Sequence, residues 1–506
     1  MPFWPAHPVI YEINTWVWLH ELSRQHGAPV TLANVPGEVW DSIEQLSIDA
    51  VWFMGVWQRS PAGIDIANRN ERLLEDFRVA LSDFATEDNV GSAYCVRGYE
   101  VDAHLGDVTA LAIARRELAA RGIKLILDFV PNHVAPDHSW VSDHPEYFLQ
   151  GDLADVANDP LAFAAIAGNV FARGRDPYFP AWPDVLQLNA FHPALRRAAI
   201  ETLADIARQC DGVRCDMAML LMNSIFARTW GQRAGPRPET EYWIEVISAL
   251  KAVHPEFTFI AEAYWDLEWE LQQQGFDYCY DKRLYDRLEH DTAENVRLHL
   301  CADLPYQQKL IRFTENHDEP RAYTAFAAAK GRAAAVTAAT IPGAKLFHEG
   351  QFEGRTMRVP VFLRRRAEER AKPDIQAFYH TLLRLLGCEA LRTGSWQLCE
   401  RMGWRDNASY RNLVAWCWRS TEQRCVIVVN LSPSQAQGVV HLPWQDLSAH
   451  IWRMTDFFSA EQYEREGDEL CTRGLYVDLP PWGYHVFDLQ ASMPIRDSRS
   501  GAATTV

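Results

Sequence analysis

Four short segments of the sequence place acidic, basic and imidazole side chains directly after apolar runs. The segments read ILDFVPNH, GVRCDMAM, FIAEAYW and FTENHDEPR. The side chains of interest in them are Asp128, His133, Arg214, Asp216, Glu262, His317 and Asp318. A single carboxylate after a strand is ordinary, because an Asp that caps a helix gives the same pattern. Four such segments are not explained by caps, and they predict a rim where several carboxylates meet.

Carboxylates in this number suit the cleavage of glycosidic bonds. One carboxyl must deliver a proton to the leaving oxygen, while another stabilises or attacks an oxocarbenium-like centre. Arg214 stands two residues before Asp216, so in a strand both side chains point to the same face. There Arg214 can hold Asp216 ionised and oriented through a charge-assisted hydrogen bond. The alternative for Arg214 is a plain ion pair that neutralises a buried carboxylate.

Eight apolar runs, alternating with amphipathic stretches, are the elements that must position these side chains. The runs are Val9–Asn14, Ala50–Val56, Lys124–Phe129, Gly212–Asp216, Phe257–Glu262, Phe276–Tyr280, Leu310–Thr314 and Lys345–His348. The helical candidates include Asp107–Arg121, Pro193–Gln209, Thr240–Val253 and Arg321–Thr340. This alternation predicts an α/β fold, a closed (β/α)8 TIM barrel with its active site at the carboxyl ends of the strands.

Three stretches fall outside the repeating units. Residues 134–188 are too long for a simple loop, and we expect an excursion after the third strand that forms one wall of a cleft. Residues 393–490 hold short β-rich runs punctuated by Pro, Gly and Ser, which predict a C-terminal antiparallel β-sandwich. The small polar residues of 491–506 predict a disordered tail. The barrel is thus expected to comprise residues 1–133 and 189–392.

The four segments resemble, in order and in strand context, the four signature regions of the α-amylase family, glycoside hydrolase family 13. AYCVRGYEVD resembles the family's Gly-Tyr segment before the third strand, and WPDVLQLN precedes the fourth strand much as in relatives. IPGAKLFHEGQ is similar to the family's eighth-strand segment. The resemblance covers the barrel, and the C-terminal β-domain fits the family's usual sandwich without a specific motif.

The resemblance implies a role for each of the three carboxylates. Asp216 corresponds to the nucleophile and Glu262 to the acid/base of a retaining mechanism. Asp318 corresponds to the third carboxylate, which binds ring hydroxyls and favours the distorted sugar.

The same resemblance implies the residues that surround the reacting glucose. His133 and His317 resemble the family's sugar-hydroxyl ligands, with Arg214 beside them. Tyr99 resembles the aromatic platform on which the glucose stacks. The equivalent of Asp128 supports the rim more than it contacts substrate. Taken singly, each histidine is more often structural, but beside Asp128 and Asp318 a role in the site is favoured. Further candidates for the cleft are Trp16, Trp18, Trp57 and Trp265, although any single tryptophan is more often a core residue.

The sequence departs from the endo-acting members of the family after the nucleophile. It reads Met217–Ala218–Met219 where such enzymes often carry a Lys-His pair that contacts the next sugar. We therefore expect a retaining glycosidase that acts on short α-glucosides or oligosaccharides. Water as the acceptor would give hydrolysis, a sugar would give transfer or isomerisation, and phosphate would give phosphorolysis. One fold serves all of these reactions. A more distant alternative is a non-catalytic carbohydrate-binding relative, although such members usually lose one of the carboxylates.

Composition excludes several other classes of function. The formal net charge of −18 over 506 residues argues against a nucleic-acid surface, since phosphate binding needs clustered Lys and Arg. No apolar run is long enough to span a membrane, and the first residues lack the pattern of a secretory signal. The ten cysteines are scattered without a CxxC pair, as in a reducing compartment. We expect a cytoplasmic protein whose partner is a small-molecule or oligosaccharide substrate.

A metal or cofactor requirement is not expected. Asn132 matches a position that binds calcium in many α-amylases, and Asp137 or Asp176 could supply further oxygens. However, the excursion has no dense Asp/Asn cluster, and many intracellular relatives lack the site. No His/Cys spacing indicates zinc, and no Gly-rich phosphate loop follows a strand.

Overall fold

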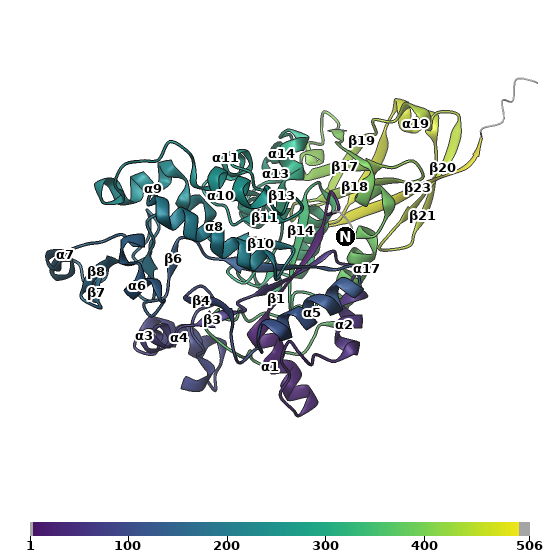
Figure 1. Ribbon diagram of the computed structural model, residues 1–506. Coiled ribbons are helices and arrows are strands. Elements are labelled where there is room, and N and C mark those ends of the chain that lie inside the picture. The colour runs from purple at the N-terminus through teal and green to yellow at the C-terminus, as the bar shows by residue number, and fades with distance from the viewer. Residues whose placement is uncertain (1–3, 495–506) are drawn as a thin grey trace, which may run out of the picture.

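The structure is a computed structural model that describes residues 4–494, and eight parallel strands close into a barrel within it (Figure 1). Around the barrel the order is β1, β14, β13, β12, β11, β10, β5, β2. Their bounds are Val9–Asn14 (β1), Ala50–Met54 (β2), Lys124–Phe129 (β5), Gly212–Cys215 (β10), Thr258–Ala261 (β11), Tyr278–Tyr280 (β12), Leu310–Arg312 (β13) and Ala344–His348 (β14). All eight predicted strands are present, each within two residues of its predicted bounds, and the predicted TIM barrel is confirmed.

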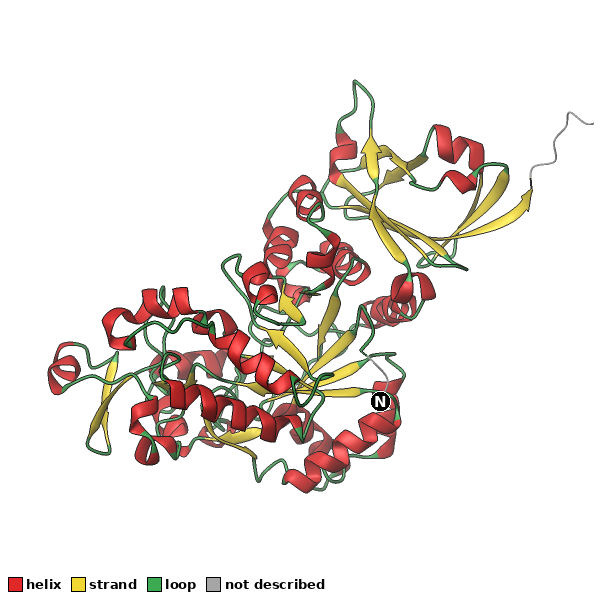
Figure 2. Ribbon diagram, turned by 45° about the horizontal axis from the view of Figure 1, so that its top comes forward, coloured by secondary structure: helices red, strands yellow, loops and turns green. Residues whose placement is uncertain are grey.

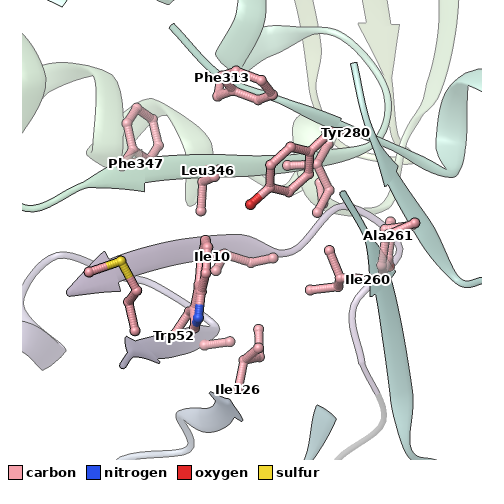
Figure 3. Packing of buried hydrophobic residues seen from close by; sticks show 14 of the residues in the cluster. Ile10, Trp52, Ile126, Ile260, Ala261, Tyr280, Phe313, Leu346 and Phe347 are labelled. Atoms are coloured by element: carbon pink, nitrogen blue, oxygen red, sulfur yellow. The ribbon is translucent and has the colours of Figure 1, made fainter. Parts of the chain in front are cut away.

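Apolar side chains fill the interior of this barrel. Ile10, Ile126, Ile260 and Tyr280, each from a different strand, point toward one another around Trp52 (Figure 3). Every residue of β2, β10, β11 and β14 is buried. Because the interior is a packed core and not a channel, polar side chains with chemistry to perform lie at the rim.

Helices surround the strands (Figure 2). They are Thr15–His26 (α1), Gly37–Glu44 (α2), Val108–Ala120 (α5), Pro193–Ala207 (α8), Asn223–Trp230 (α9), Tyr242–Lys251 (α10), Glu268–Gln273 (α11), Lys282–His290 (α12), Ala293–His299 (α13), Leu304–Gln308 (α14), Ala322–Ala325 (α15), Ala328–Thr340 (α16), Pro373–Leu386 (α17) and Glu389–Thr393 (α18). In α8 the buried residues Leu195, Ala199, Leu203 and Ile206 recur every three or four positions, so one face packs on the barrel.

The helix predicted over Arg321–Thr340 is interrupted. The chain forms α15, breaks at Ala327, and resumes as α16. Ala327 has a φ of 57°, a left-handed conformation that cannot continue a right-handed helix. The composition of the segment, rich in alanine, favours a continuous helix and gives no sign of the break.

The excursion after β5 builds a small layer of its own, seen at the left of Figure 1. Its elements are His133–Val134 (β6), Trp140–Asp143 (α6), Leu153–Asn158 (α7), Phe163–Ile166 (β7), Asn169–Ala172 (β8) and Leu186–Gln187 (β9). β6 pairs with β9, and β7 pairs with β8, both antiparallel. A separate apolar cluster that includes Phe148, Phe171 and Leu186 holds this layer together.

A second insertion, between β2 and α5, was not predicted. It contains Trp57–Arg59 (β3), Pro61–Ala67 (α3), Glu71–Ala80 (α4) and Val96–Val101 (β4). β3 and β4 pair antiparallel across register shifts. The segment that resembles the family's Gly-Tyr region therefore ends in a strand of this insertion.

The C-terminal part is antiparallel β-structure, as predicted. A six-stranded sheet has the order β15, β17, β18, β23, β20, β21, and a three-stranded sheet has the order β16, β19, β22. The strands are Ser395–Leu398 (β15), Glu400–Met402 (β16), Leu413–Arg419 (β17), Arg424–Asn430 (β18), Ala436–His441 (β19), His450–Asp456 (β20), Gln462–Glu466 (β21), Leu475–Leu479 (β22) and Tyr484–Pro494 (β23), with the helix Gly467–Thr472 (α19) between β21 and β22. The predicted tail begins too early, because residues 491–494 pair with β20 as part of β23. Its remainder, 495–506, lies outside the described residues.

Two tryptophans join this β-domain to the barrel. The indole N–H groups of Trp416 and Trp418 both donate to the backbone carbonyl of Thr340, at 3.1 and 2.7 Å. Both indoles are buried, and Thr340 is the last residue of α16. The helix that precedes the eighth barrel strand is thus fixed to β17.

Two findings bear on the predicted cellular setting. Between residues 4 and 494, no helix has the length and apolar character needed to cross a membrane. All ten cysteines have free thiols, and most of them are buried.

Candidate active site

The first two predicted carboxylates follow neighbouring strands of the barrel. The backbone N–H of Asp216 donates to Phe129 O at 2.8 Å, and that of Glu262 donates to Cys215 O at 3.1 Å. These bonds extend the hydrogen bonding between neighbouring barrel strands by one residue past the ends of β10 and β11. Both side chains are buried, so their positions are set by the sheet and not by a mobile loop.

One guanidinium bridges the two carboxylates. Nη1 of Arg214 donates to Asp216 Oδ1 at 2.7 Å, and Nη2 lies 2.8 Å from Glu262 Oε2. Arg214 is buried, and its charge also lies 5.0 Å from the ring centre of Tyr94. Because the guanidinium is planar and rigid, it fixes the spacing and orientation of Asp216 relative to Glu262. The structure thus contains the predicted contact of Arg214 with Asp216, and Arg214 also contacts Glu262.

Glu262 is held in a way that suits a proton donor. Its Oε2 accepts from the backbone N–H of Met217 at 2.6 Å, and its Oε1 accepts from the Tyr264 hydroxyl at 2.9 Å. Burial raises the pKa of Glu262 to about 7, and the negative charges of Asp216 and Asp318 add to this against the lowering effect of Arg214. A carboxyl with this pKa carries a proton for much of the time near neutral pH.

The environments of the other two carboxylates differ from that of Glu262. Burial raises the pKa of Asp216 from its ordinary value, but Arg214 opposes this through its charge and its hydrogen bond. Desolvation also acts to raise the pKa of Asp318, but the neighbouring His317 outweighs it and lowers that pKa to about 2. The side chain of Asp318 is 44% exposed, so this carboxylate is accessible from outside. Separation of carboxyl pKa values by environment is how acid and base roles are divided within one site.

His317 is charged because it stands between two carboxylates. Its Nδ1 lies 2.5 Å from Glu12 Oε1, and its Nε2 lies 2.9 Å from Asp318 Oδ2. Although burial lowers the pKa of His317, Asp318 and Glu12 raise it well above its usual value. Glu12 is fully buried in β1 and was missed from the sequence, although a lone acid within the apolar run VIYEIN was a usable signal.

Tyr94, and not the predicted Tyr99, joins this cluster. The Tyr94 hydroxyl lies 2.9 Å from Nε2 of His317, and the two rings stack with centres 5.3 Å apart. Tyr99 instead uses its hydroxyl on the backbone of Val130, accepting from its N–H at 2.9 Å and donating to its carbonyl at 3.0 Å. Both tyrosines belong to the segment AYCVRGYEVD, and the structure places Tyr94 of the two beside His317.

Tyr99 therefore has a structural position. Its ring packs against Trp57 at 5.5 Å and against Phe129 at 5.8 Å, between the insertion and β5. Tyr99 belongs to β4, whereas Tyr94 precedes the strand and lies beside Arg214 and His317. The sugar-stacking role implied for Tyr99 stays a prediction.

His133 and Asp128 lie deeper in the rim. His133 is buried, its ring packs edge-on against Trp182 of the excursion at 5.1 Å, and burial lowers its pKa to about 4, so it is neutral. Asp128 faces Arg214 at 3.7 Å across the β5–β10 pair. Its Oδ2 accepts from the Gly55 N–H at 3.0 Å, and burial raises its pKa to about 6. These contacts agree with a supporting role for Asp128.

Met217 has an unusual backbone. Its φ of 44° and ψ of 45° are left-handed, which is uncommon for a residue with a long side chain. This conformation turns its N–H toward Glu262. Ala218 and Met219 are fully buried, so of the three residues that replace the Lys-His pair only Met217 is partly exposed.

The side chains present do not fit a calcium site. Oδ1 of Asn132 accepts from the Gln187 amide at 2.9 Å, so it is already engaged. Asp137 accepts from the Ser60 hydroxyl at 2.5 Å, and Asp176 accepts two backbone N–H groups of its own loop. In the part of the chain that the structure describes, no three His, Cys, Asp or Glu residues gather as metal ligands. That the protein needs no metal or cofactor stays a prediction.

Comparison with known proteins places the barrel in a family. The family described as alpha amylase, catalytic domain, matches residues 38–413. The α-amylase MalA of Haloarcula japonica is 25% identical over 362 residues, which are 69% of this chain and 44% of that protein. A cyclomaltodextrinase of Geobacillus thermopakistaniensis is 24% identical over 239 residues, 45% of this chain and 37% of that protein. The chain spans about half or less of the length of these curated relatives.

Solved structures share the fold over nearly the whole chain. A maltogenic α-amylase, AmyB of Thermotoga neapolitana, superposes with a TM-score of 0.67 at 16% sequence identity. The alignment covers 96% of this chain and 98% of the AmyB chain. A cyclic α-maltosyl-(1→6)-maltose hydrolase of Arthrobacter globiformis has a TM-score of 0.63 at 15% identity, over 97% of this chain and all of its own. At these identities the likeness concerns the fold. Because the family match covers well over half of the sequence and contains all three carboxylates, the chain belongs to the α-amylase family.

Proposed function

We propose that the protein is a retaining glycosidase that cleaves α-glucosidic bonds of short α-glucosides or oligosaccharides. The observation that carries this proposal is the buried Arg214, which holds Asp216 on one side and Glu262 on the other. A retaining pair stands about 5–5.5 Å apart, whereas an inverting pair leaves about 6.5–9.5 Å for a water. Two carboxylates on one guanidinium fit the closer spacing.

The proposed first step forms a bond between Asp216 and the anomeric carbon. The glycosidic C–O bond breaks, and its oxygen takes the proton of Glu262 as the leaving group departs. A pKa of about 7 gives Glu262 this proton near neutral pH. Arg214 meanwhile keeps Asp216 ionised by hydrogen bonding to it.

The second step regenerates both carboxyls. Glu262, now ionised, takes a proton from water or from a sugar hydroxyl, whose oxygen bonds to the anomeric carbon as the bond to Asp216 breaks. Asp318, ionised and partly exposed, and the charged His317 are placed to bind ring hydroxyls. In this proposal, the ring of Tyr94 stacks on the face of the bound sugar.

A preference for short substrates rests on the residues after the nucleophile. With Ala218 and Met219 buried, this turn offers the next sugar no cation or imidazole. Transfer to a sugar is the closest alternative, because it differs only in the acceptor of the second step. A cytoplasmic location belongs to the same proposal and is supported by the free thiols of all ten cysteines.

A substrate panel tests the proposal. Maltose, trehalose, sucrose, isomaltose, maltooligosaccharides and soluble starch are compared by kcat/KM, and proton NMR follows which anomer is released first. We expect highest kcat/KM on a short substrate, release of the α-anomer, and loss of turnover by several orders of magnitude in a folded Asp216→Asn variant. Initial release of the β-anomer, or near wild-type activity of Asp216→Asn, would refute it, and internal cleavage of starch would refute the short-substrate part.

A further inference from the structure

The segment that follows β14 gathers arginines in a chain that is acidic as a whole. From Arg355 to Arg370 it reads RTMRVPVFLRRRAEER, with six arginines and two glutamates, whereas the formal net charge of the chain is −18. Together with α1, this segment lines a cavity of about 500 Å³. Asp216, Glu262 and Asp318 do not line it, so the proposed reaction gives these arginines no role.

Two arginines of the lining are already neutralised. Each of them stands between two carboxylates at ion-pair distance, so its charge is matched and its side chain is held in place. These two arginines therefore form a wall of the cavity. The ion pairs are those of Arg365 with Asp83 and Asp88, and of Arg366 with Glu21 and Glu349.

Arg355 is held differently. Its side chain is only 12% exposed, and the carboxylate within ion-pair distance of it is Glu21, 3.6 Å from Nη2. Glu21 is already engaged by Arg366. Nε of Arg355 is buried and has no hydrogen-bond partner among residues 4–494. Because the donors of a buried guanidinium normally have acceptors, Arg355 points to an acceptor that enters through the cavity.

Two further arginines of the lining have donors to offer. Arg24 pairs with Glu368 at 2.6 Å, but both side chains are mostly exposed, and such a pair contributes little to stability. Arg370 is exposed and forms no ion pair within the part of the chain that the structure describes. Three guanidinium groups, from α1 and from the segment after β14, are therefore available to one ligand in this cavity.

The charges around the cavity favour an anion. Its lining has five arginines and three glutamates. One of these acids, Glu369, is occupied, because its Oε2 accepts from the backbone N–H and the hydroxyl of Thr356, at 2.8 and 2.6 Å. Burial lowers the pKa of His20, and the charges of Arg364 and Arg365 lower it further. The His20 imidazole is therefore mostly neutral near pH 7, so it can exchange a hydrogen bond with a hydroxyl.

We propose that this cavity binds a phosphorylated monosaccharide, with its phosphate on Arg24, Arg355 and Arg370. A phosphate monoester carries a charge of about −1.5 to −2 near pH 7 and has three strong acceptor oxygens. Guanidinium groups bind such oxygens through pairs of parallel hydrogen bonds. The cavity volume lies in the range of sites for small organic ligands, and His20 offers a contact for a sugar hydroxyl.

The site is distinct from the catalytic cluster, although a wall joins the two. Arg366 pairs with Glu349 at 2.6 Å, and the backbone N–H of Glu349 donates to Glu12 O at 2.9 Å. Glu12 in turn contacts His317. A ligand in the cavity lies behind this wall and does not touch the reacting carboxyls. It is therefore not the substrate of the proposed reaction, and its binding does not depend on that reaction.

Calorimetric titration of the whole protein with glucose 6-phosphate tests the site, with inorganic phosphate and glucose as comparison ligands. The wild type is expected to bind glucose 6-phosphate at least about tenfold more tightly than either of them. Arg355→Gln and Arg370→Gln should each weaken this binding about tenfold or more, because each removes charge-assisted hydrogen bonds. Arg370→Gln is the second variant because its exposed side chain is not needed for folding. Arg473→Gln is the matched control, since Arg473 is 81% exposed and absent from the lining, and it should leave Kd unchanged.

The outcomes bear on this site alone, because none of them requires turnover. Absence of binding at about 10 mM glucose 6-phosphate, or equal affinity for glucose, would overturn the proposal. If inorganic phosphate binds as tightly as glucose 6-phosphate, the sugar part is wrong. If Arg355→Gln and Arg370→Gln match Arg473→Gln, the phosphate is not held by these arginines. Asp216→Asn should bind glucose 6-phosphate as the wild type does, and an altered affinity would place this ligand at the catalytic cluster instead.

Discussion

The Tyr264 hydroxyl should set the alkaline limit of activity through Glu262. Tyr264→Phe removes one hydrogen bond to Oε1 and leaves the ring in place. Because this bond stabilises the ionised carboxylate, its loss should raise the pKa of Glu262 above its value of about 7. Hydrogen bonds to charged groups contribute about 1.5–3 kcal/mol, and part of this energy is kept when Glu262 is protonated. We therefore expect the pKa of Glu262 to rise by about one unit.

The wild-type profile provides the reference. With a pKa of about 7, the protonated fraction falls from about one half at pH 7 to about one tenth at pH 8, so kcat/KM on maltose should fall about fivefold. In Tyr264→Phe the same fall in kcat/KM should occur at a pH about one unit higher. The measurement is kcat/KM between pH 5 and 10 for both proteins.

α-Glucosyl fluoride supplies the internal control. Its leaving group needs little protonation, so the alkaline fall should be shallow on this substrate even in the wild type. If the fall is equally steep on both substrates, or if Tyr264→Phe leaves its midpoint unchanged on maltose, Glu262 is not the group that limits activity at high pH.

Three further predictions concern other parts of the molecule. Glu12→Gln should lower the pKa of His317 toward the neutral range and reduce kcat/KM above pH 7, and an unshifted imidazole titration by NMR would contradict this. Trp418→Ala removes a buried indole that donates to the Thr340 carbonyl, so it should lower the free energy of unfolding by about 3–5 kcal/mol in a denaturant titration, and a change below about 1 kcal/mol would show that the junction contributes little. Incubation with EDTA should leave Tm unchanged because the Asn132 amide is already engaged, whereas a clear drop would reveal a metal site.

The barrel could be predicted from sequence because its signal is local. A buried parallel strand is a short run of apolar residues, and all eight runs appear between helical stretches. The break at Ala327 could not be predicted, because alanine is the best helix former and the left-handed turn there comes from tertiary packing. The insertion between β2 and α5 was missed for a similar reason, since its strands β3 and β4 are short and irregularly paired.

The site could be predicted from the sequence where its residues directly follow the end of a barrel strand. Asp216 and Glu262 continue the ladders of β10 and β11, so position along a strand determined where their side chains would lie. Loop residues lack this constraint. Tyr94 and Tyr99 are five residues apart in one segment, and only the fold of the insertion decides which ring meets His317. The contact of Glu12 with His317 joins residues from opposite ends of the barrel sequence, which no local pattern reveals.

The left-handed backbone of Met217 has a consequence for how this protein can change under selection. Such a conformation costs a long side chain about 1–2 kcal/mol, and Gly or Asn would relieve much of this cost. The same replacements would remove the Met217 side chain from the lining of the cavity that it shares with Tyr264 beside Glu262. A β-branched residue would instead distort the turn and withdraw the N–H from Glu262. A replacement at position 217 is therefore expected to change the stability of the protein and the surroundings of Glu262 at the same time.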